Sequence, residues 1–201
     1  GVKELKGCNH RVIPDRIEAG SFAIAAAITK SSLELCNCEP KHLESLSKKL
    51  INAGVNWESD KDIIKITSDG ILKPVNVQTS EYPDFPTDLQ AQFMTLMTVA
   101  NGNSEIIENI FENRFMHVPE LLRMGANISV NGGVAKVSGV QNLKGAQIMA
   151  TDLRASISLI IAALRAEGES YISRIYHLDR GYEEIERKFQ DCGANIVRIA
   201  N

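Results

Sequence analysis

Three stretches of this chain begin alike and decide its fold: "RIEAGSFAIAAAITKSSLEL" from Arg16, "DLQAQFMTLMTVANGNSEII" from Asp88 and "DLRASISLIIAALRAEGESYI" from Asp152. After its first residue, each copy has an aliphatic residue, a polar residue and an alanine in succession. A run of mostly apolar and small residues follows in every copy. Self-similarity at a regular period is typical of a fold built from repeated units.

A second landmark recurs further along each copy. The strings are "KKLINAGVNW", "LLRMGANISV" and "KFQDCGANIV", and their shared glycines are Gly54, Gly125 and Gly193. Two landmarks in the same order in three copies predict three structural units within one domain. The predicted units cover about residues 10–70, 71–143 and 144–201.

Each copy has the pattern of a helix, a strand and a second helix. The first helix is apolar nearly all round, as from Phe22 to Ile28, and such a helix is buried on every side. The second is amphipathic and is expected to end at the shared glycine in a left-handed conformation. In the first copy its apolar face is Leu43, Leu46, Leu50 and Ile51. The expected strands between the helices cover residues 33–38, 105–110 and 170–175.

Two further strands follow the shared glycine in the first two copies. In "NISVNGGVAKVSG" the residues Asn131, Gly132 and Gly133 form a good hairpin turn. Small residues on the apolar helices permit close helix packing, and their Ser and Thr hydroxyls can bond back to helix carbonyls. The sequence therefore predicts an α/β fold in which βαβα-ββ units repeat with pseudo-threefold symmetry, helices inside and sheets outside.

Composition narrows the classes of function. The chain has 201 residues, 44% hydrophobic and 23% charged, with a net charge of −3. This charge argues against a general nucleic-acid or acidic-membrane binder, and no apolar run approaches the ~18 residues of a membrane span. The four cysteines lack the spacing of a zinc site and are expected to be reduced thiols, which favours the cytoplasm. We expect no metal and no cofactor.

Asp88 in "PDFPTDLQAQF" has two possible roles. Thr87 and Gln90 fit a capping box, in which Thr87 is the N-cap and Asp88 is the first helical residue, favoured there by the helix dipole. Alternatively, Asp88 performs chemistry. In the third copy Asp152 takes the matched place, whereas the first copy has Arg16 there. An aspartate is thus permitted at this position and not required by it, so the residues alone leave both roles open.

The chain resembles the UDP-N-acetylglucosamine 1-carboxyvinyltransferases, the enolpyruvyl transferases that open peptidoglycan synthesis in bacteria. The resemblance is carried by "PDRIEAGSFAIAAA", "FPTDLQAQF", "FENRFMHVPELLRMGA", "GAQIMATDLRASISLIIAAL" and "RIYHLDRGYEEIERKFQDCGANI". It extends over essentially the whole chain but covers only the C-terminal part of a family member. It implies phosphoenolpyruvate and UDP-N-acetylglucosamine as substrates and an N-terminal catalytic domain as partner.

The resemblance also implies roles for individual residues. Asp88 would contact the 3-hydroxyl of the sugar as the candidate base, and a helix N-terminus keeps such a carboxylate ionised. Arg180 in "HLDRGYE" would bind phosphoenolpyruvate, and Arg114 in "FENRFMH" would lie near the reacting centre. Ile110, expected at a strand end, would pack against the nucleotide sugar. Asp152, with the neighbouring Leu153 and Arg154, would lie beside the site or merely cap the third apolar helix.

The family's acid, a cysteine on a mobile loop, has no counterpart in this chain. The chain also starts at Gly1 rather than Met, and the third copy lacks the returning strand of the other two. We therefore expect a part of a longer protein that is inactive alone. The alternatives are a non-catalytic binding or interaction module of the same fold, and a related enolpyruvyl transferase that acts on shikimate 3-phosphate.

Overall fold

Three apolar helices form the centre of the molecule in the computed structural model, which describes residues 1–199. They are α1 (Arg16–Ile28), α3 (Gln90–Met97) and α5 (Leu153–Arg165), and each packs against the other two. Gly20 permits close approach, because a Cβ atom there would lie 2.8 Å from a methyl carbon of Leu89. Most residues of these helices are buried, including all eight of α3, which confirms the prediction of interior helices.

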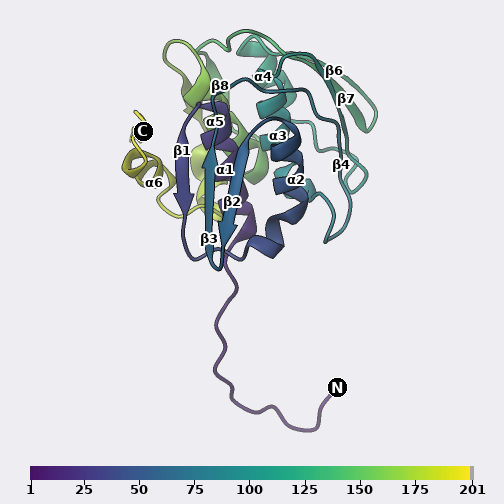
Figure 1. Ribbon diagram of the computed structural model, residues 1–201, viewed down its shortest axis with the longest axis vertical. Helices are drawn as coiled ribbons and strands as arrows, with labels where there is room; N and C mark the ends of the chain where they lie inside the picture. The colour runs from purple at the N-terminus through teal and green to yellow at the C-terminus, as the bar shows by residue number, and fades with distance from the viewer. Residues whose placement is uncertain (200–201) are drawn as a thin grey trace.

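Three separate sheets surround the central helices (Figure 1). The first is antiparallel in the order β1-β3-β2, and the second has the order β4-β5-β7-β6, with only the β4–β5 pair parallel. The third is a parallel pair, β8-β9. The strands are β1 (Ser32–Leu35), β2 (Asn56–Asp60), β3 (Ile63–Thr67), β4 (Val77–Gln78), β5 (Asn103–Ile107), β6 (Asn127–Asn131), β7 (Val134–Ser138), β8 (Gln147–Met149) and β9 (Tyr171–Ser173).

Short helices connect the strands. The shared glycines that follow the three amphipathic helices have φ angles of 97°, 87° and 91°, so the predicted left-handed helix ends are confirmed. The predicted hairpin turn at Gly132 and Gly133 is also confirmed. The connecting elements are η1 (Pro40–Leu43), α2 (Glu44–Asn52), η2 (Thr87–Leu89), α4 (Val118–Arg123), η3 (Ile175–Arg180) and α6 (Ile185–Asp191).

The strands that follow the central helices are shorter or shifted relative to the prediction. β1 ends at Leu35 because the chain turns at Asn37, whose φ is 57°. The predicted strand over residues 33–38 therefore ends three residues early, and Cys36 and Cys38 lie beyond it. In the third sheet Arg174 has a φ of 59° and ends β9, and η3 begins where the prediction continued the strand.

The amphipathic face of α2 is narrower than its sequence suggested. Leu46 and Leu50 are fully buried, but Ile51 is 51% exposed and does not belong to the core. Successive residues of a helix point about 100° apart, so Ile51 points away from the one face that Leu46 and Leu50 bury. The predicted back-bonding of hydroxyls is confirmed, because Ser21 and Thr95 donate to helix carbonyl oxygens at 2.8 and 3.1 Å.

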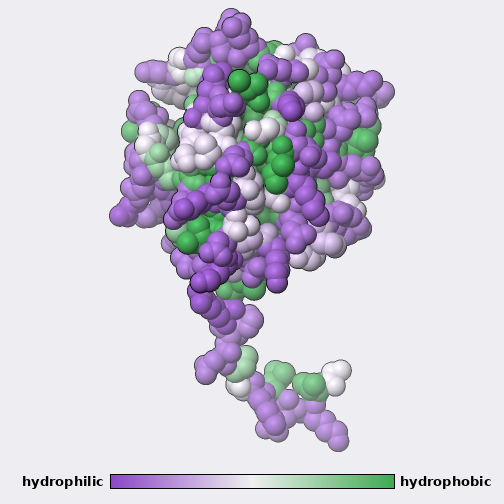
Figure 2. Space-filling model, viewed as in Figure 1, coloured by the Kyte–Doolittle hydropathy of each residue, from purple (hydrophilic) through white to green (hydrophobic). Residues whose placement is uncertain are grey.

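Residues 1–15 extend away from the folded body, and all of them are exposed (Figure 1). Hydrophobic residues are visible along this segment (Figure 2). The exposed large apolar side chains of residues 1–15 are Val2, Leu5, Val12 and Ile13. None of the helices in residues 1–199 combines the length and apolar character needed to cross a membrane.

Candidate active site

Asp88 lies in the 3-10 turn η2, which leads directly into α3. The predicted capping box is wrong. The residue at the N-cap is Pro86, which has no side-chain acceptor, and the Thr87 hydroxyl donates instead to Glu108 Oε2 at 2.9 Å. The Gln90 side chain is buried and makes no hydrogen bond within residues 1–199. None of these side chains caps the helix. The Asp88 carboxylate makes no capping hydrogen bond either, and its partners come from outside η2 and α3.

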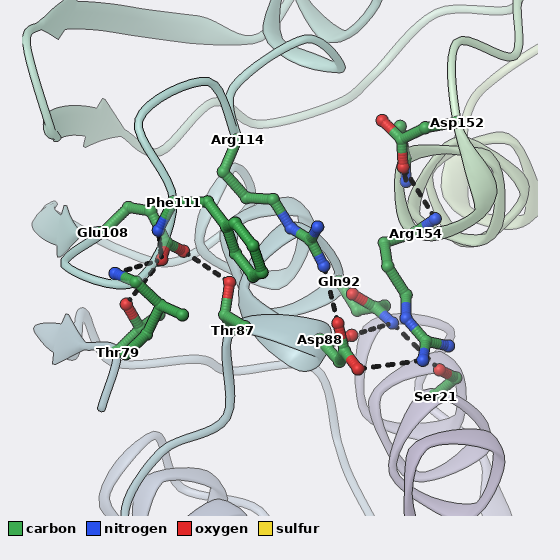
Figure 3. Close-up of polar contacts among 12 residues, drawn as sticks. Ser21, Thr79, Thr87, Asp88, Gln92, Glu108, Phe111, Arg114, Asp152 and Arg154 are labelled. Carbon is green, nitrogen blue, oxygen red and sulfur yellow. Dashed lines mark hydrogen bonds and ion pairs between the residues drawn. The ribbon is translucent and has the colours of Figure 1, made fainter. Parts of the chain in front are cut away.

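Two guanidinium groups hold the Asp88 carboxylate, one at each oxygen (Figure 3). Arg114 Nη2 donates to Oδ1 at 2.6 Å and Arg154 Nη2 donates to Oδ2 at 2.9 Å. Arg114 comes from the segment after β5, and Arg154 from the first turn of α5. The Asp88 side chain remains 36% exposed, whereas the two arginine side chains are 22% and 21% exposed. The carboxylate is thus fixed by charge-assisted hydrogen bonds yet open to a ligand.

The Arg154 guanidinium is partly buried, and its neighbours stabilise its charged form. Burial alone opposes its charged form, but hydrogen bonds and charges from Asp88 and Tyr182 outweigh burial and raise the pKa of Arg154. Burial also raises the pKa of Tyr182, so its hydroxyl stays protonated and can donate. Arg154 is therefore a permanent cation beside Asp88.

A buried hydrogen-bond chain supports the backbone of Asp88 (Figure 3). Gln92 Nε2 lies 2.9 Å from the Asp88 carbonyl oxygen and 3.1 Å from Ser21 Oγ, and donates to both. Ser21 Oγ in turn lies 3.0 Å from the Tyr182 hydroxyl. Side chains from α1, from α3 and from the segment before α6 thus form a chain that ends at the Asp88 carbonyl oxygen.

Asp152 has the capping role that Asp88 lacks. Its Oδ1 accepts the backbone N–H groups of Arg154 at 2.8 Å and Ala155 at 2.9 Å, which makes it the N-cap of α5. In the first copy the N-cap of α1 is Asp15, one residue ahead of the matched Arg16. A capping carboxylate therefore starts the first and third central helices but not the second.

His117 is buried close to both Asp152 and Arg114. Burial lowers its pKa from 6.5 to about 4; the nearby Asp152 charge acts against that shift and the Arg114 charge adds to it. Its Nε2 atom has no hydrogen-bond partner within residues 1–199. The imidazole is therefore neutral near pH 7 and is held by packing.

The remaining predicted site residues are Ile110 and Arg180, and neither forms a hydrogen bond with Asp88 within residues 1–199. Ile110 is half-buried and is three residues beyond the end of β5, so its expected place at a strand end is wrong. Its N–H donates to Glu108 Oε1 at 2.9 Å. Arg180 is exposed at the end of η3 and forms no ion pair or side-chain hydrogen bond with any other residue in the range 1–199.

The sequence reasoning missed one contact and one residue of this cluster. Arg154 was expected near the site, but its ion pair with Asp88 was not anticipated, because the two residues belong to different copies of the repeat. Glu108 was not singled out at all. The one signal that could have found it is an acidic residue between the isoleucines Ile107 and Ile110 of "SEIIENI", because a carboxylate buried among apolar residues requires hydrogen-bond partners.

Solved structures define the class of this fold. The chain is similar to the enolpyruvyl transferase NikO from Streptomyces tendae, with 28% identity and a TM-score of 0.83 over 92% of this chain and 44% of that one. An EPSP synthase from Acinetobacter baumannii shares the fold at 16% identity, with a TM-score of 0.71 over 92% of this chain and 46% of that one. The fold is that of the enolpyruvyl transferases.

Residues 1–189 match the family described as EPSP synthase (3-phosphoshikimate 1-carboxyvinyltransferase), and the chain belongs to this family. Two curated relatives are named UDP-N-acetylglucosamine 1-carboxyvinyltransferase. The relative from Koribacter versatilis is 55% identical over 99% of this chain and 46% of its own length. That from Shewanella sp. (strain ANA-3) is 52% identical over 99% of this chain and 48% of its own length. The resemblance carried by the five strings is confirmed, and the chain spans about half the length of these relatives.

Proposed function

We propose that this chain is the C-terminal half of a transferase that moves the enolpyruvyl group of phosphoenolpyruvate to the 3-hydroxyl of UDP-N-acetylglucosamine. The observation that carries the proposal is the Asp88 carboxylate, partly exposed and fixed between Arg114 and Arg154. Relatives at 52–55% identity are named for the transfer to this sugar nucleotide. In this proposal the three copies form one domain with pseudo-threefold symmetry.

Asp88 has the chemistry of a base for the sugar hydroxyl. Each carboxylate oxygen has two lone pairs, and the arginines use one on each oxygen, so an acceptor site remains for a substrate O–H. The hydroxyl proton would pass to Asp88 while the sugar oxygen bonds to carbon 2 of phosphoenolpyruvate. A proton must also reach carbon 3 of phosphoenolpyruvate, and loss of phosphate together with one proton from carbon 3 then restores the double bond. The acid for carbon 3 would come from the other half of the protein.

The arginines and the apolar residues would bind the substrates. Arg180 is exposed and carries a permanent charge, which suits the phosphate and carboxylate of phosphoenolpyruvate. Arg114 lies within 2.6 Å of Asp88 and would stabilise negative charge at the reacting centre. Ile110 would pack against the nucleotide sugar. Asp152, a helix cap in the same region, would reach the substrate only through neighbouring side chains.

A mixing experiment tests the proposal. This chain is combined with a separately produced N-terminal half of a relative, and phosphate release is followed with phosphoenolpyruvate and UDP-N-acetylglucosamine. We expect release only when both halves and both substrates are present, and loss of release with Asp88→Asn. A full-length fusion of the two halves serves as the positive control. A fusion that releases no phosphate with this acceptor contradicts the proposal.

A second acceptor is tested because the family description names a 3-phosphoshikimate transferase. The same mixture is therefore assayed with shikimate 3-phosphate in place of the sugar nucleotide. Phosphate release with shikimate 3-phosphate but not with UDP-N-acetylglucosamine would assign the protein to the other acceptor class. Release with neither acceptor, together with tight binding of UDP-N-acetylglucosamine, would favour a non-catalytic binding module.

A further inference from the structure

Glu108 is a buried carboxylate directly after β5, and its side chain forms no ion pair within residues 1–199. It is only 5% exposed. Burying a charge without a partner is costly unless hydrogen bonds replace its hydration. Glu108 meets this condition with four donors: Thr79 Oγ1, Ile110 N and Phe111 N at Oε1, and Thr87 Oγ1 at Oε2.

The two oxygens of Glu108 accept hydrogen bonds from two different segments of the candidate site (Figure 3). Oε2 accepts from Thr87 at 2.9 Å, and Thr87 is the residue directly before Asp88. Oε1 accepts from the N–H groups of Ile110 and Phe111 at 2.9 and 3.2 Å. The Phe111 ring lies 4.9 Å from the Arg114 guanidinium carbon. The Glu108 carboxylate therefore supports both the residue before Asp88 and the segment that carries Arg114, the ion-pair partner of Asp88.

We propose that Glu108 is a positioning residue that sets the placement of Asp88 relative to the 110–114 segment. Glu108 acts through Thr87 and through the backbone of Ile110 and Phe111, and it does not contact the substrate. The catalytic consequence of this role rests on the proposed transferase function. The structural consequence is a coupling between the two segments, and it can be measured on this chain whether or not the proposed function holds.

Hydrogen-bond chemistry explains why a carboxylate stands here. Thr79 Oγ1 accepts the Asn109 N–H at 2.9 Å, so the Thr79 hydroxyl hydrogen is free to point at Glu108 Oε1. All the partners of Oε1 are donors, and only an acceptor fits them. Thr87 Oγ1 can either donate or accept. A glutamine at position 108 fits in one orientation only, with its carbonyl oxygen at the Oε1 place and its amide donating to Thr87.

Amide hydrogen exchange on this chain tests the coupling without any need for turnover. Glu108→Ala is expected to speed exchange about tenfold or more in residues 85–93 and in residues 106–116 together, because hydrogen bonds to a charged group are lost in both. The β2–β3 hairpin, residues 56–67, belongs to another sheet, so it is the internal reference and should be unchanged. Glu108→Gln should restore most of the protection. Faster exchange in residues 106–116 alone would overturn the proposal.

Two matched threonines keep the test decisive if Glu108→Ala fails to fold. Thr87 and Thr79 each donate to Glu108 at 2.9 Å, but only Thr87 adjoins Asp88. Thr87→Val should speed exchange in residues 85–93, whereas Thr79→Val should leave that segment within about twofold of the wild type, since Oε1 keeps two other donors. Equal effects of the two variants on residues 85–93 would contradict the assignment.

Steady-state kinetics of the two-half protein then test the catalytic consequence. Thr87→Val should lower kcat about tenfold with KM for the sugar nucleotide within about twofold, as expected when geometry and not binding is lost. A purely structural role would lower the unfolding midpoint and leave kcat at 25 °C unchanged, which would refute the catalytic part. If the wild-type protein itself shows no turnover, the proposed function fails, and the exchange data still decide the coupling.

Discussion

Asp88 and Asp152 occupy matched places in two copies of one repeat, yet the structure uses them differently. Asp152 accepts two backbone N–H groups and caps α5, whereas Asp88 accepts two guanidinium groups and caps no helix. One of those guanidinium groups belongs to Arg154, which matches Gln90 in the copy that contains Asp88. A residue of the third copy thus completes a site in the second. The comparison teaches that similar local sequences can build an asymmetric site when units face one another.

The largest expected effect separates the two kinds of aspartate by activity. In the two-half protein, Asp88→Asn should lower turnover about 10²–10⁴-fold, the range typical of losing a general base. Asp15→Asn is the matched control, because it retains a good N-cap of α1 and should stay within about twofold of the wild type. Phosphate release under saturating substrates measures both. Similar losses in both variants would show that Asp88 matters only for folding.

A second matched pair carries the comparison into the core. Residues 1–7 and 139–145 share the pattern Gly-Val-x-x-Leu-Lys-Gly, but Leu143 is fully buried and Leu5 is 89% exposed. Leu143→Ala should cost about 2–5 kcal/mol of unfolding free energy, and Leu5→Ala less than about 0.5 kcal/mol. Urea denaturation of this chain measures both. A comparable cost for Leu5→Ala would mean that the tail packs in solution.

His117 gives the comparison a dependence on pH, since it lies beside both Asp152 and Arg114. Its folded pKa of about 4 is below the ordinary 6.5, so the unfolded chain binds the proton more readily. The stability from the neutral imidazole is therefore fully present above pH 6.5 and is lost as the pH falls towards 4, on the order of 3 kcal/mol in total. The unfolding free energy, measured at several pH values between 4 and 6.5, should depend less steeply on pH in His117→Gln than in the wild type. An unchanged slope contradicts this assignment.

The smallest expected effect concerns the capping role itself. Asp152→Ala removes the acceptor for two N–H groups and should cost about 1 kcal/mol, whereas Asp152→Asn should cost only a few tenths, because Asn caps nearly as well. Thermal unfolding of this chain resolves the difference. Asp15→Ala should behave like Asp152→Ala, since Asp15 caps α1 in the same way. Equal costs for the Ala and Asn variants of Asp152 would mean that its charge matters more than its cap.

Much of the fold was predictable from local patterns. The apolar runs around Ile24 and Ile160 predicted buried helices, and the shared glycines predicted left-handed helix ends, because both signals depend on nearest neighbours along the chain. The capping box at Thr87 was predicted wrongly for the same reason. A local rule assigned the Thr87 hydroxyl to its own helix, but Glu108, which is distant in the sequence, offered a buried acceptor that the local backbone did not.

The sequence by itself determined the order of the elements, the buried faces of the central helices and the place of Asp88 at the start of one of them. Only the tertiary structure decided that Arg114 and Arg154 meet at Asp88 and that Glu108 accepts a hydrogen bond from the neighbouring Thr87. The physical reason is range. Hydrophobic periodicity and backbone preference act within a few residues, whereas an ion pair or a buried carboxylate requires partners that packing brings together from separate parts of the chain.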